Sequence, residues 1–285
     1  MLKLITATVV GAVLLAYTVN AAEVSPYGTF NYKYSHDENA NGVAYDKLEN
    51  NGSILGVRII EDFDEASSLS GIATLEVGLD VDDSGSDTFD SRLAFVGLEN
   101  NGVAITVGRQ AHASVSQTNN FEVYGNNAVF KYADRSSNSI KLDNGTFSAM
   151  AIVDGQSGKS GIDMYEWGLS HSWNDISLSA GYADDRVNDI SYWAGGASTS
   201  VGDITIASTY SIYDAATDLT GMEATVGWKA LTVGYGDKEG TGTYMTYGVN
   251  HNMTKNLSVY AEMQQDDLDT GTDLQHYSFG TKFVF

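Results

Sequence analysis

The last ten residues, HYSFGTKFVF from 276 to 285, alternate between two kinds of side chain with a period of two. One face of this segment carries Tyr277, Phe279, Thr281, Phe283 and Phe285. Such alternation is typical of a β-strand whose two faces meet different surroundings. A soluble β-sandwich and a membrane β-barrel both contain strands of this kind, so the rest of the chain has to decide between them.

The alternation recurs throughout the chain. ISLSAGY at 176–182 and LSVYAEM at 257–263 each set apolar side chains against mostly small or polar ones. Strands are predicted near 25–34, 51–61, 68–80, 89–99, 103–110, 128–134, 138–143, 146–153, 163–173, 176–183, 189–199, 203–213, 219–228, 231–237, 242–251, 257–265 and 274–285. A barrel with both chain ends on one side needs an even number of strands. We therefore merge 128–134 with 138–143 into one interrupted strand, with a bulge or bend at 135–137, and predict about sixteen strands.

The connections fall into two classes that alternate along the chain. Tight turns are predicted at 100–102, 143–145, 174–175 and 229–230, and Asn-Gly between alternating strands is a strong hairpin signal. Longer, mostly acidic connections are predicted at 35–50, 81–87, 111–127, 154–162, 184–189, 214–219 and 266–273. Short turns at one end and long loops at the other are typical of outer-membrane barrels, whereas a sandwich would mix them.

The first 21 residues have the composition of a secretory signal peptide. Lys3 precedes an apolar run, and small residues end at Ala21. The run is too short for a membrane-spanning helix, and no later segment is apolar enough for one. The sequence therefore predicts a cleaved leader at 1–21 and a single barrel domain at 22–285, delivered through the inner membrane.

Composition restricts the function. The chain has a formal net charge of −22, which should repel nucleic acid. It has no cysteine, so no thiolate metal site or thiol nucleophile is expected. Its five histidines show no metal-ligand spacing, and we predict neither a metal site nor a cofactor. An enzyme that assembles Ser, His and Asp from distant strands stays open as an alternative.

A sheet in lipid must leave no unpaired edge, so the last strand is expected to pair with the first. The predicted fold is an all-β, transmembrane, antiparallel up-and-down barrel whose terminal aromatic rings lie at the lipid interface.

Several motifs, in this order, resemble the general porins of Gram-negative outer membranes, which are trimeric sixteen-stranded diffusion channels. They are SILGVRIIEDF at 53–63, SRLAFVGLENNGVAITVGRQ at 91–110, RSSNSIKL at 135–142 and the terminal FVF. The resemblance implies a homotrimer in the outer membrane, in contact with lipid and lipopolysaccharide. It also implies that Phe283 and Phe285 are read by the barrel-assembly machinery, and that 111–127 is a constriction loop that folds into the pore.

Candidate pore-lining residues follow from alternation and from the resemblance. Alternation puts Lys33, Arg58, Arg92 and Lys141 on the face away from lipid. Arg109 matches the basic wall of the family by motif, although its alternation goes with lipid-facing residues, so a bulge or the end of the strand has to turn it inward. Glu122 is the one acid in the candidate constriction loop, and Ile54 stands where the family usually has a base.

The sequence thus predicts a passive channel for small hydrophilic solutes and ions. Cation preference is expected because acids outnumber bases, 37 to 15, and many of them fall in the long connections. A substrate-specific channel and a narrow structural barrel without an open lumen are alternatives that sequence alone leaves open.

Overall fold

The computed structural model describes residues 22–38, 41–63, 68–80, 88–114, 134–155 and 161–285. In chain order its strands are β1 (Glu23–Glu38), β2 (Ala44–Asn50), β3 (Ile54–Asp62), β4 (Leu69–Leu79), β5 (Phe89–Asn100), β6 (Val103–Ala111), β7 (Arg135–Asp143), β8 (Phe147–Ile152), β9 (Met164–Trp173), β10 (Ile176–Asp185), β11 (Ile190–Val201), β12 (Ile204–Asp214), β13 (Leu219–Trp228), β14 (Leu231–Lys238), β15 (Gly242–Asn252), β16 (Leu257–Leu268) and β17 (Asp273–Val284). Within the described ranges, no helix has the length and apolarity needed to cross a membrane.

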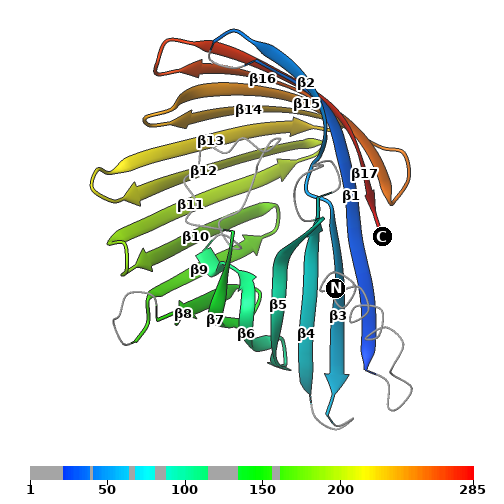
Figure 1. The fold of residues 1–285 in the computed structure, drawn as a ribbon, viewed down its shortest axis with the longest axis vertical. Helices are drawn as coiled ribbons and strands as arrows, with labels where there is room; N and C mark the ends of the chain where they lie inside the picture. The colour runs from blue at the N-terminus through cyan, green and yellow to red at the C-terminus, as the bar shows by residue number, and fades with distance from the viewer. Residues whose placement is uncertain (1–21, 39–40, 64–67, 81–87, 115–133, 156–160) are drawn as a thin grey trace.

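The strands form one closed antiparallel sheet. β1 pairs with β17 from Thr29↔Val284 to Asp37↔His276, and Figure 1 shows this seam between the blue β1 and the red β17. Along its other edge β1 is long enough to pair with both β2 and β3. β2 and β3 therefore act as one interrupted strand, and the 17-stranded sheet has sixteen strands around the barrel. The predicted closed sixteen-stranded barrel is confirmed.

The interruption lies between β2 and β3, not where the sequence placed it. At this break Gly52 has φ 79°, and Asn50 and Ser53 satisfy backbone groups that the ladder leaves open. The Ser53 backbone N–H donates to Asn50 Oδ1 at 3.0 Å, and the Asn31 N–H donates to Ser53 Oγ at 3.0 Å. An irregularity is present close to the bulge or bend predicted at 135–137, because the pairing of β7 with β6 skips Ser137 and Asn138, but it does not split β7. Residues 128–133 lie outside the described ranges.

The two classes of connection lie at opposite ends of the barrel, as predicted. All four predicted tight turns lie at what we call the turn end, where the chain also leaves β17. Asn101 and Gly102 have φ of 51° and 78°, the conformation that a two-residue hairpin turn requires. The opposite end, which we call the loop end, is less loop-rich than expected. The predicted loop 35–50 is mostly strand, with only 39–43 outside β1 and β2, and the connections 186–189, 215–218 and 269–272 are short.

The alternating aromatic residues at the end of the sequence lie on β17, which pairs with β1. Phe285 exchanges backbone hydrogen bonds with Gly28, at 3.0 and 3.1 Å, and so extends the seam to the last residue. Its ring stacks on Phe30, with centroids 5.9 Å apart. Phe279 and Phe283 are exposed on the outer face at 60% and 42%. The predicted pairing of the last strand with the first is confirmed.

Three tyrosines on the inner face lie flat against glycines of neighbouring strands. Tyr27 covers Gly56, Tyr244 covers Gly236 and Tyr260 covers Gly280, and a Cβ at any of these glycines would overlap the ring. The hydroxyls are held as well: Tyr27 donates to Glu76 at 3.1 Å, Tyr244 donates to Glu223 at 3.1 Å, and Tyr260 donates to Asn31 at 2.9 Å. These pairs fix the rings along the wall of the barrel.

Candidate functional site

The inner face of the barrel is polar and cross-linked, whereas the outer face is apolar and exposed. Val96 and Leu98 on β5 are exposed at 61% and 49%, and Ile105 on β6 is exposed at 54%. The side chains that alternate with them meet one another across strands: Gln110 Nε2 on β6 donates to Ser139 Oγ on β7 at 3.1 Å. Because the sheet is closed, this inner face lines a lumen, and the candidate site is its wall.

Each base that alternation assigned to the wall has a carboxylate partner on it. The pairs are Lys33–Glu49 at 3.2 Å, Arg58–Glu99 at 3.8 Å, Arg92–Glu76 at 2.6 Å and Lys141–Asp143 at 3.3 Å. None of these acids lies in the candidate constriction loop. Opposite charges at this separation cancel much of each other's field at a distance. The bases therefore present less positive charge to the lumen than the sequence alone suggests.

A first cavity of about 480 Å³ lies on the inner face of β1, β15, β16 and β17, and we call it the acid pocket. His276 lies at its centre, with Nδ1 3.1 Å from Asp37 Oδ1 and Nε2 2.9 Å from Asp266 Oδ2. Glu262 also lines the pocket and accepts a hydrogen bond from Ser278 Oγ at 3.0 Å. Sequence reasoning placed Asp37 and Asp266 among loop acids, because it assigned 35–50 and 266–273 to loops.

A second cavity of about 510 Å³ lies on the other side of the β2–β3 break, and we call it the arginine pocket. It is lined by Arg92, Arg109 and Arg135, together with Asp80 and Asp90. Neutral oxygens hold Arg109: its Nε donates to the Ser91 carbonyl at 3.2 Å and its Nη1 donates to Ser137 Oγ at 3.1 Å. Sequence reasoning missed Arg135 as a site residue, although it opens the RSSNSIKL motif that carried part of the family resemblance.

Irregular pairing brings these arginines to one place. The register of β4 and β5 shifts between Glu76 and Val77, which leaves Arg92 as the extra residue of a bulge. The register of β6 and β7 shifts between Gly108 and Gln110, at Arg109. Gly108 has φ 138°, and a Cβ there would overlap the backbone of β5, so only glycine fits. A bulge at Arg109 was one of the two outcomes that the sequence left open.

The chain after β6 is anchored on the inner wall. The Glu166 carboxylate on β9 accepts hydrogen bonds from the backbone N–H groups of Ala113 and Ser114, at 2.7 and 3.2 Å, and from Ser114 Oγ at 2.6 Å. His112 Nδ1 lies 3.0 Å from the same carboxylate. All of these groups are buried. Residues 112–114 thus cross the inner faces of β7 and β8 to reach β9.

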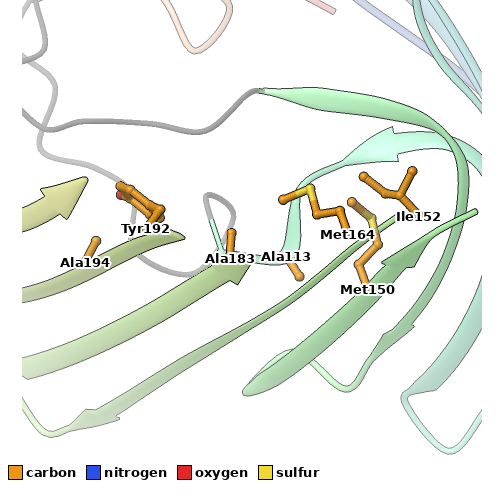
Figure 2. Close-up of a cluster of buried hydrophobic side chains, with 7 residues drawn as sticks. All are labelled: Ala113, Met150, Ile152, Met164, Ala183, Tyr192 and Ala194. Atoms are coloured by element: carbon orange, nitrogen blue, oxygen red, sulfur yellow. The ribbon is translucent and has the colours of Figure 1, made fainter. Parts of the chain in front are cut away.

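A small apolar cluster supports this anchor. Figure 2 shows Ala113 beside Met164 and Ala183, and the remaining members come from β8 and β11. The cluster consists of Ala113, Met150, Ile152, Met164, Ala183, Tyr192 and Ala194. The beginning of the candidate constriction loop therefore lies inside the barrel. Glu122 and the rest of that loop from 115 to 127 lie outside the described residues.

Some acids at the loop end stabilise turns, whereas others are exposed to solvent. Asp185 is buried and accepts hydrogen bonds from the backbone N–H groups of Val187 and Asn188, at 2.9 and 3.0 Å, so it closes a turn. Asp218 is exposed in the connection after β12, where a hydrogen bond with Asp214 and their mutual repulsion raise the pKa of Asp218. Asp82, Asp83 and Asp87 lie outside the described ranges. The acids of the predicted long connections therefore do not all present free charge at the loop end.

The sequence of this closed barrel with a charged inner face was compared with models of known protein families. A model of the Gram-negative porins matches residues 6–271. The chain belongs to the Gram-negative porin family. This porin is accordingly a protein of the outer membrane, with the barrel of a general diffusion channel. A comparison with curated protein sequences found no match.

Solved structures similar to this porin share its fold at low sequence identity. The anion-selective porin from Comamonas acidovorans is 18% identical, with a TM-score of 0.72 over 93% of this chain and 100% of that one. OmpT of Vibrio cholerae in its trimer form is 16% identical, with a TM-score of 0.72 over 93% and 100%. OmpF of Salmonella typhi in complex with daunomycin is 14% identical, with a TM-score of 0.77 over 94% and 99%.

Proposed function

We propose that this porin is a passive channel for small hydrophilic solutes and ions that prefers cations, and that it catalyses no reaction. The observation that carries the preference is the pairing of Lys33, Arg58, Arg92 and Lys141 with carboxylates on the wall. Paired bases contribute little net field, so the overall excess of acid is expected to set the sign. The paired bases, Arg109 and the candidate loop acid Glu122 remain the proposed pore-lining residues.

The arginine pocket is the argument against this preference. Among the described residues Arg109 is bound by neutral oxygens, which leave its charge uncompensated, so this part of the wall should attract anions. The fold leaves the sign open, because one similar structure is of an anion-selective porin. The acid pocket offsets this argument, because it carries Asp37, Glu262 and Asp266 against Lys33 and one histidine.

The reversal potential across a tenfold KCl gradient in a planar bilayer tests the preference. At about 0.1 M salt the Debye length is roughly 10 Å, so charges on the wall act across a lumen of that scale. At about 1 M it falls to roughly 3 Å. We expect a potential of the sign for potassium preference in dilute salt, fading as salt rises. A potential of the opposite sign would assign control to the arginine pocket.

We also infer a homotrimer. One structure of similar fold is described as a trimer form. On this chain the outer face near the loop end carries a polar network, which lipid chains would not solvate: Tyr34 donates to Asp46 at 2.8 Å and His36 Nδ1 lies 2.7 Å from Asp46. Leu48 beside it is 73% exposed. Native mass in mild detergent tests the inference, and a monomer would contradict it.

Delivery and assembly complete the proposal. Residues 1–21 act as a cleaved leader before the barrel domain 22–285, and Phe283 and Phe285 act as the signal for the barrel-assembly machinery. Lipid and lipopolysaccharide surround the finished barrel. The exposed terminal rings support this role. Deletion of Phe285 should slow the appearance of folded, heat-modifiable protein in cells, and normal yields would contradict it.

A substrate-specific channel is the second candidate, because the acid pocket is a built cavity and not merely a charged surface. Concentration-dependent block of the potassium current by a particular solute would favour it. A barrel enzyme would instead react with a serine-directed inhibitor in the detergent-solubilised state.

A further inference from the structure

The acid pocket has the chemistry of a specific cation-binding site, an inference that rests on the proposed channel function. His276 spans two carboxylates that come from different strands, Asp37 on β1 and Asp266 on β16. Both ring nitrogens can act as donors only when the imidazole is protonated. A neutral ring has one donor, so it leaves one of the two carboxylates with an acceptor to offer.

The charged and titratable groups around His276 carry a net negative charge. They are Lys33 and Asp37 from β1, Tyr45, Lys47 and Glu49 from β2, and Glu262 and Asp266 from β16. Lys33 lies 3.2 Å from Glu49, which leaves three carboxylates against Lys47 and the histidine. Lys47 itself lies over the ring of Tyr45, 4.6 Å from its centroid. Protonated His276 and Lys47 thus leave a net charge near −1, and neutral His276 leaves about −2.

A second observation points independently to a ligand. Thr246 on β15 lines the same cavity, is only 1% exposed, and its Oγ1 has no hydrogen-bond partner among the described residues. A buried hydroxyl without a partner is unfavourable by the amount of its lost hydration. Thr246 pairs with Gln264 on β16, and Gln264 pairs with His276, so the hydroxyl lies on the same row of the inner face as the histidine.

We propose that this cavity binds the primary ammonium group of a small organic cation on its way through the channel. An ammonium has three N–H donors and no acceptor. The carboxylates of Asp37 and Asp266 and the hydroxyl of Thr246 supply acceptors for such a group. A cavity of about 480 Å³ accommodates a small polyfunctional molecule. Within the described residues, no three His, Asp or Glu side chains come together as metal ligands, so a metal ion fits the site less well.

His276 then acts as a competitor for the same carboxylates. When it is protonated it occupies both Asp37 and Asp266, and the pocket has fewer free acceptors. When it loses its proton, an acceptor and one unit of negative charge become available to the ammonium group. Binding of the organic cation should therefore strengthen as pH rises through the histidine range, near 6.5 for an unperturbed side chain.

The test is block of the potassium current through the reconstituted full barrel by 1,4-diaminobutane, whose amines stay protonated from pH 5.5 to 8 because alkylamines titrate near pH 10. We expect block at pH 8 and weaker block, by about tenfold in half-blocking concentration, at pH 5.5. Asp266→Asn and Thr246→Val should each raise the half-blocking concentration at pH 8, the former by about tenfold. His276→Gln should remove most of the pH dependence.

Asp189→Asn is the matched control. It removes the same charge at the loop end, on the connection between β10 and β11, and asparagine suits its φ of 56°. It should leave the block unchanged. Equal loss of block in Asp189→Asn and Asp266→Asn would overturn the proposal in favour of a diffuse charge effect, and so would full pH dependence in His276→Gln.

The potassium current measured without 1,4-diaminobutane tests the channel function separately from the ammonium site. A wild-type barrel that conducts potassium but is not blocked at pH 8 overturns the inference alone. A folded barrel that does not conduct overturns the channel function and the inference with it. Heat-modifiable mobility identifies variants that fold, and Thr246→Val keeps the test available if Asp266→Asn does not fold.

Discussion

The acid pocket and the arginine pocket have similar volumes, about 480 and 510 Å³, and lie on opposite sides of the β2–β3 break. Asn51 lines the first, and Gly52 and Ser53 line the second. In the acid pocket the charges partner one another, as His276 does with two carboxylates. In the arginine pocket, Arg109 is bound by a carbonyl and a hydroxyl.

The charge that a wall presents thus depends on the partners of its ionised groups more than on their number. A base held by neutral oxygens keeps its field, whereas a base beside a carboxylate loses most of it at a distance. The break between β2 and β3 places these two kinds of surface side by side. A solute that passes the break meets opposite fields from neighbouring strands.

The largest effect on stability is expected at Glu166, which anchors residues 112–114, just after Arg109 in the chain. Glu166→Ala should lower the free energy of unfolding by roughly 3 kcal/mol or more, because it removes a buried carboxylate that accepts hydrogen bonds from two backbone N–H groups and Ser114 Oγ and lies beside His112. Urea unfolding in lipid vesicles measures it. Glu61→Ala, an exposed acid at the turn end, is the control. If the pockets are independent, block by diamine in the acid pocket should survive in any Glu166→Ala protein that folds.

Gly108→Ala should disturb the arginine pocket by changing the backbone of the bulge that positions Arg109. Alanine at a φ of 138°, against the backbone of β5, should destabilise the barrel by about 1–3 kcal/mol and displace Arg109. Gly195→Ala is the matched control, since a Cβ there meets only the Ser179 carbonyl at 3.8 Å. Equal urea midpoints for both variants would show that the bulge is not under the constraint inferred for it.

Charge removal should act in opposite directions in the two pockets. Arg109→Gln should raise the preference for potassium over chloride by roughly twofold in dilute salt, because its charge has no carboxylate neutralising it in the contacts described above. Glu262→Gln in the acid pocket should lower the same ratio. Lys229→Gln, an exposed base beside Asp203 at the turn end, should change neither. Reversal potentials measure all three, and shifts of the same sign for Arg109→Gln and Glu262→Gln would refute the contrast.

The smallest effect is expected at Arg58, whose side chain is 53% exposed and whose nitrogen lies 3.8 Å from Glu99. Exposed pairs of this kind contribute little, so Arg58→Gln should change the free energy of unfolding by less than about 0.5 kcal/mol. Arg92→Gln should exceed it, by about 1–3 kcal/mol, because Glu76 is 8% exposed and would lose its charged partner. The same urea titration compares the two.

Much of the fold could be predicted from the sequence, because barrel closure and hairpin turns both depend on short, recognisable sequence patterns. The terminal alternation predicted the β1–β17 seam, and Asn101-Gly102 predicted its hairpin. The break at 51–53 was not predictable by alternation, because it depends on Asn50 and Ser53 bonding to backbone groups across the ladder. The bulge expected at 135–137 has a counterpart within β7, but it does not interrupt that strand, because the need for an even number of strands does not say which strand is interrupted.

The candidate site was less predictable than the fold. Alternation indicates the face of a side chain but not its partner, so it found Lys33 and Lys141 but not Glu49 or Asp143. A bulge shifts the alternation by one residue, and both Arg92 and Arg109 sit at bulges. The acid pocket escaped notice because its strands extend farther toward the loop end than composition suggested.

The tyrosines that lie on glycines have a consequence for transport. A ring that stands away from the wall would obstruct the water column, whereas Tyr27, Tyr244 and Tyr260 occupy the space that their glycine neighbours leave empty. The inner wall thus carries three large aromatic rings that do not project into the lumen. A larger residue in place of any of these glycines would push its tyrosine ring away from the wall and so narrow the channel at that point.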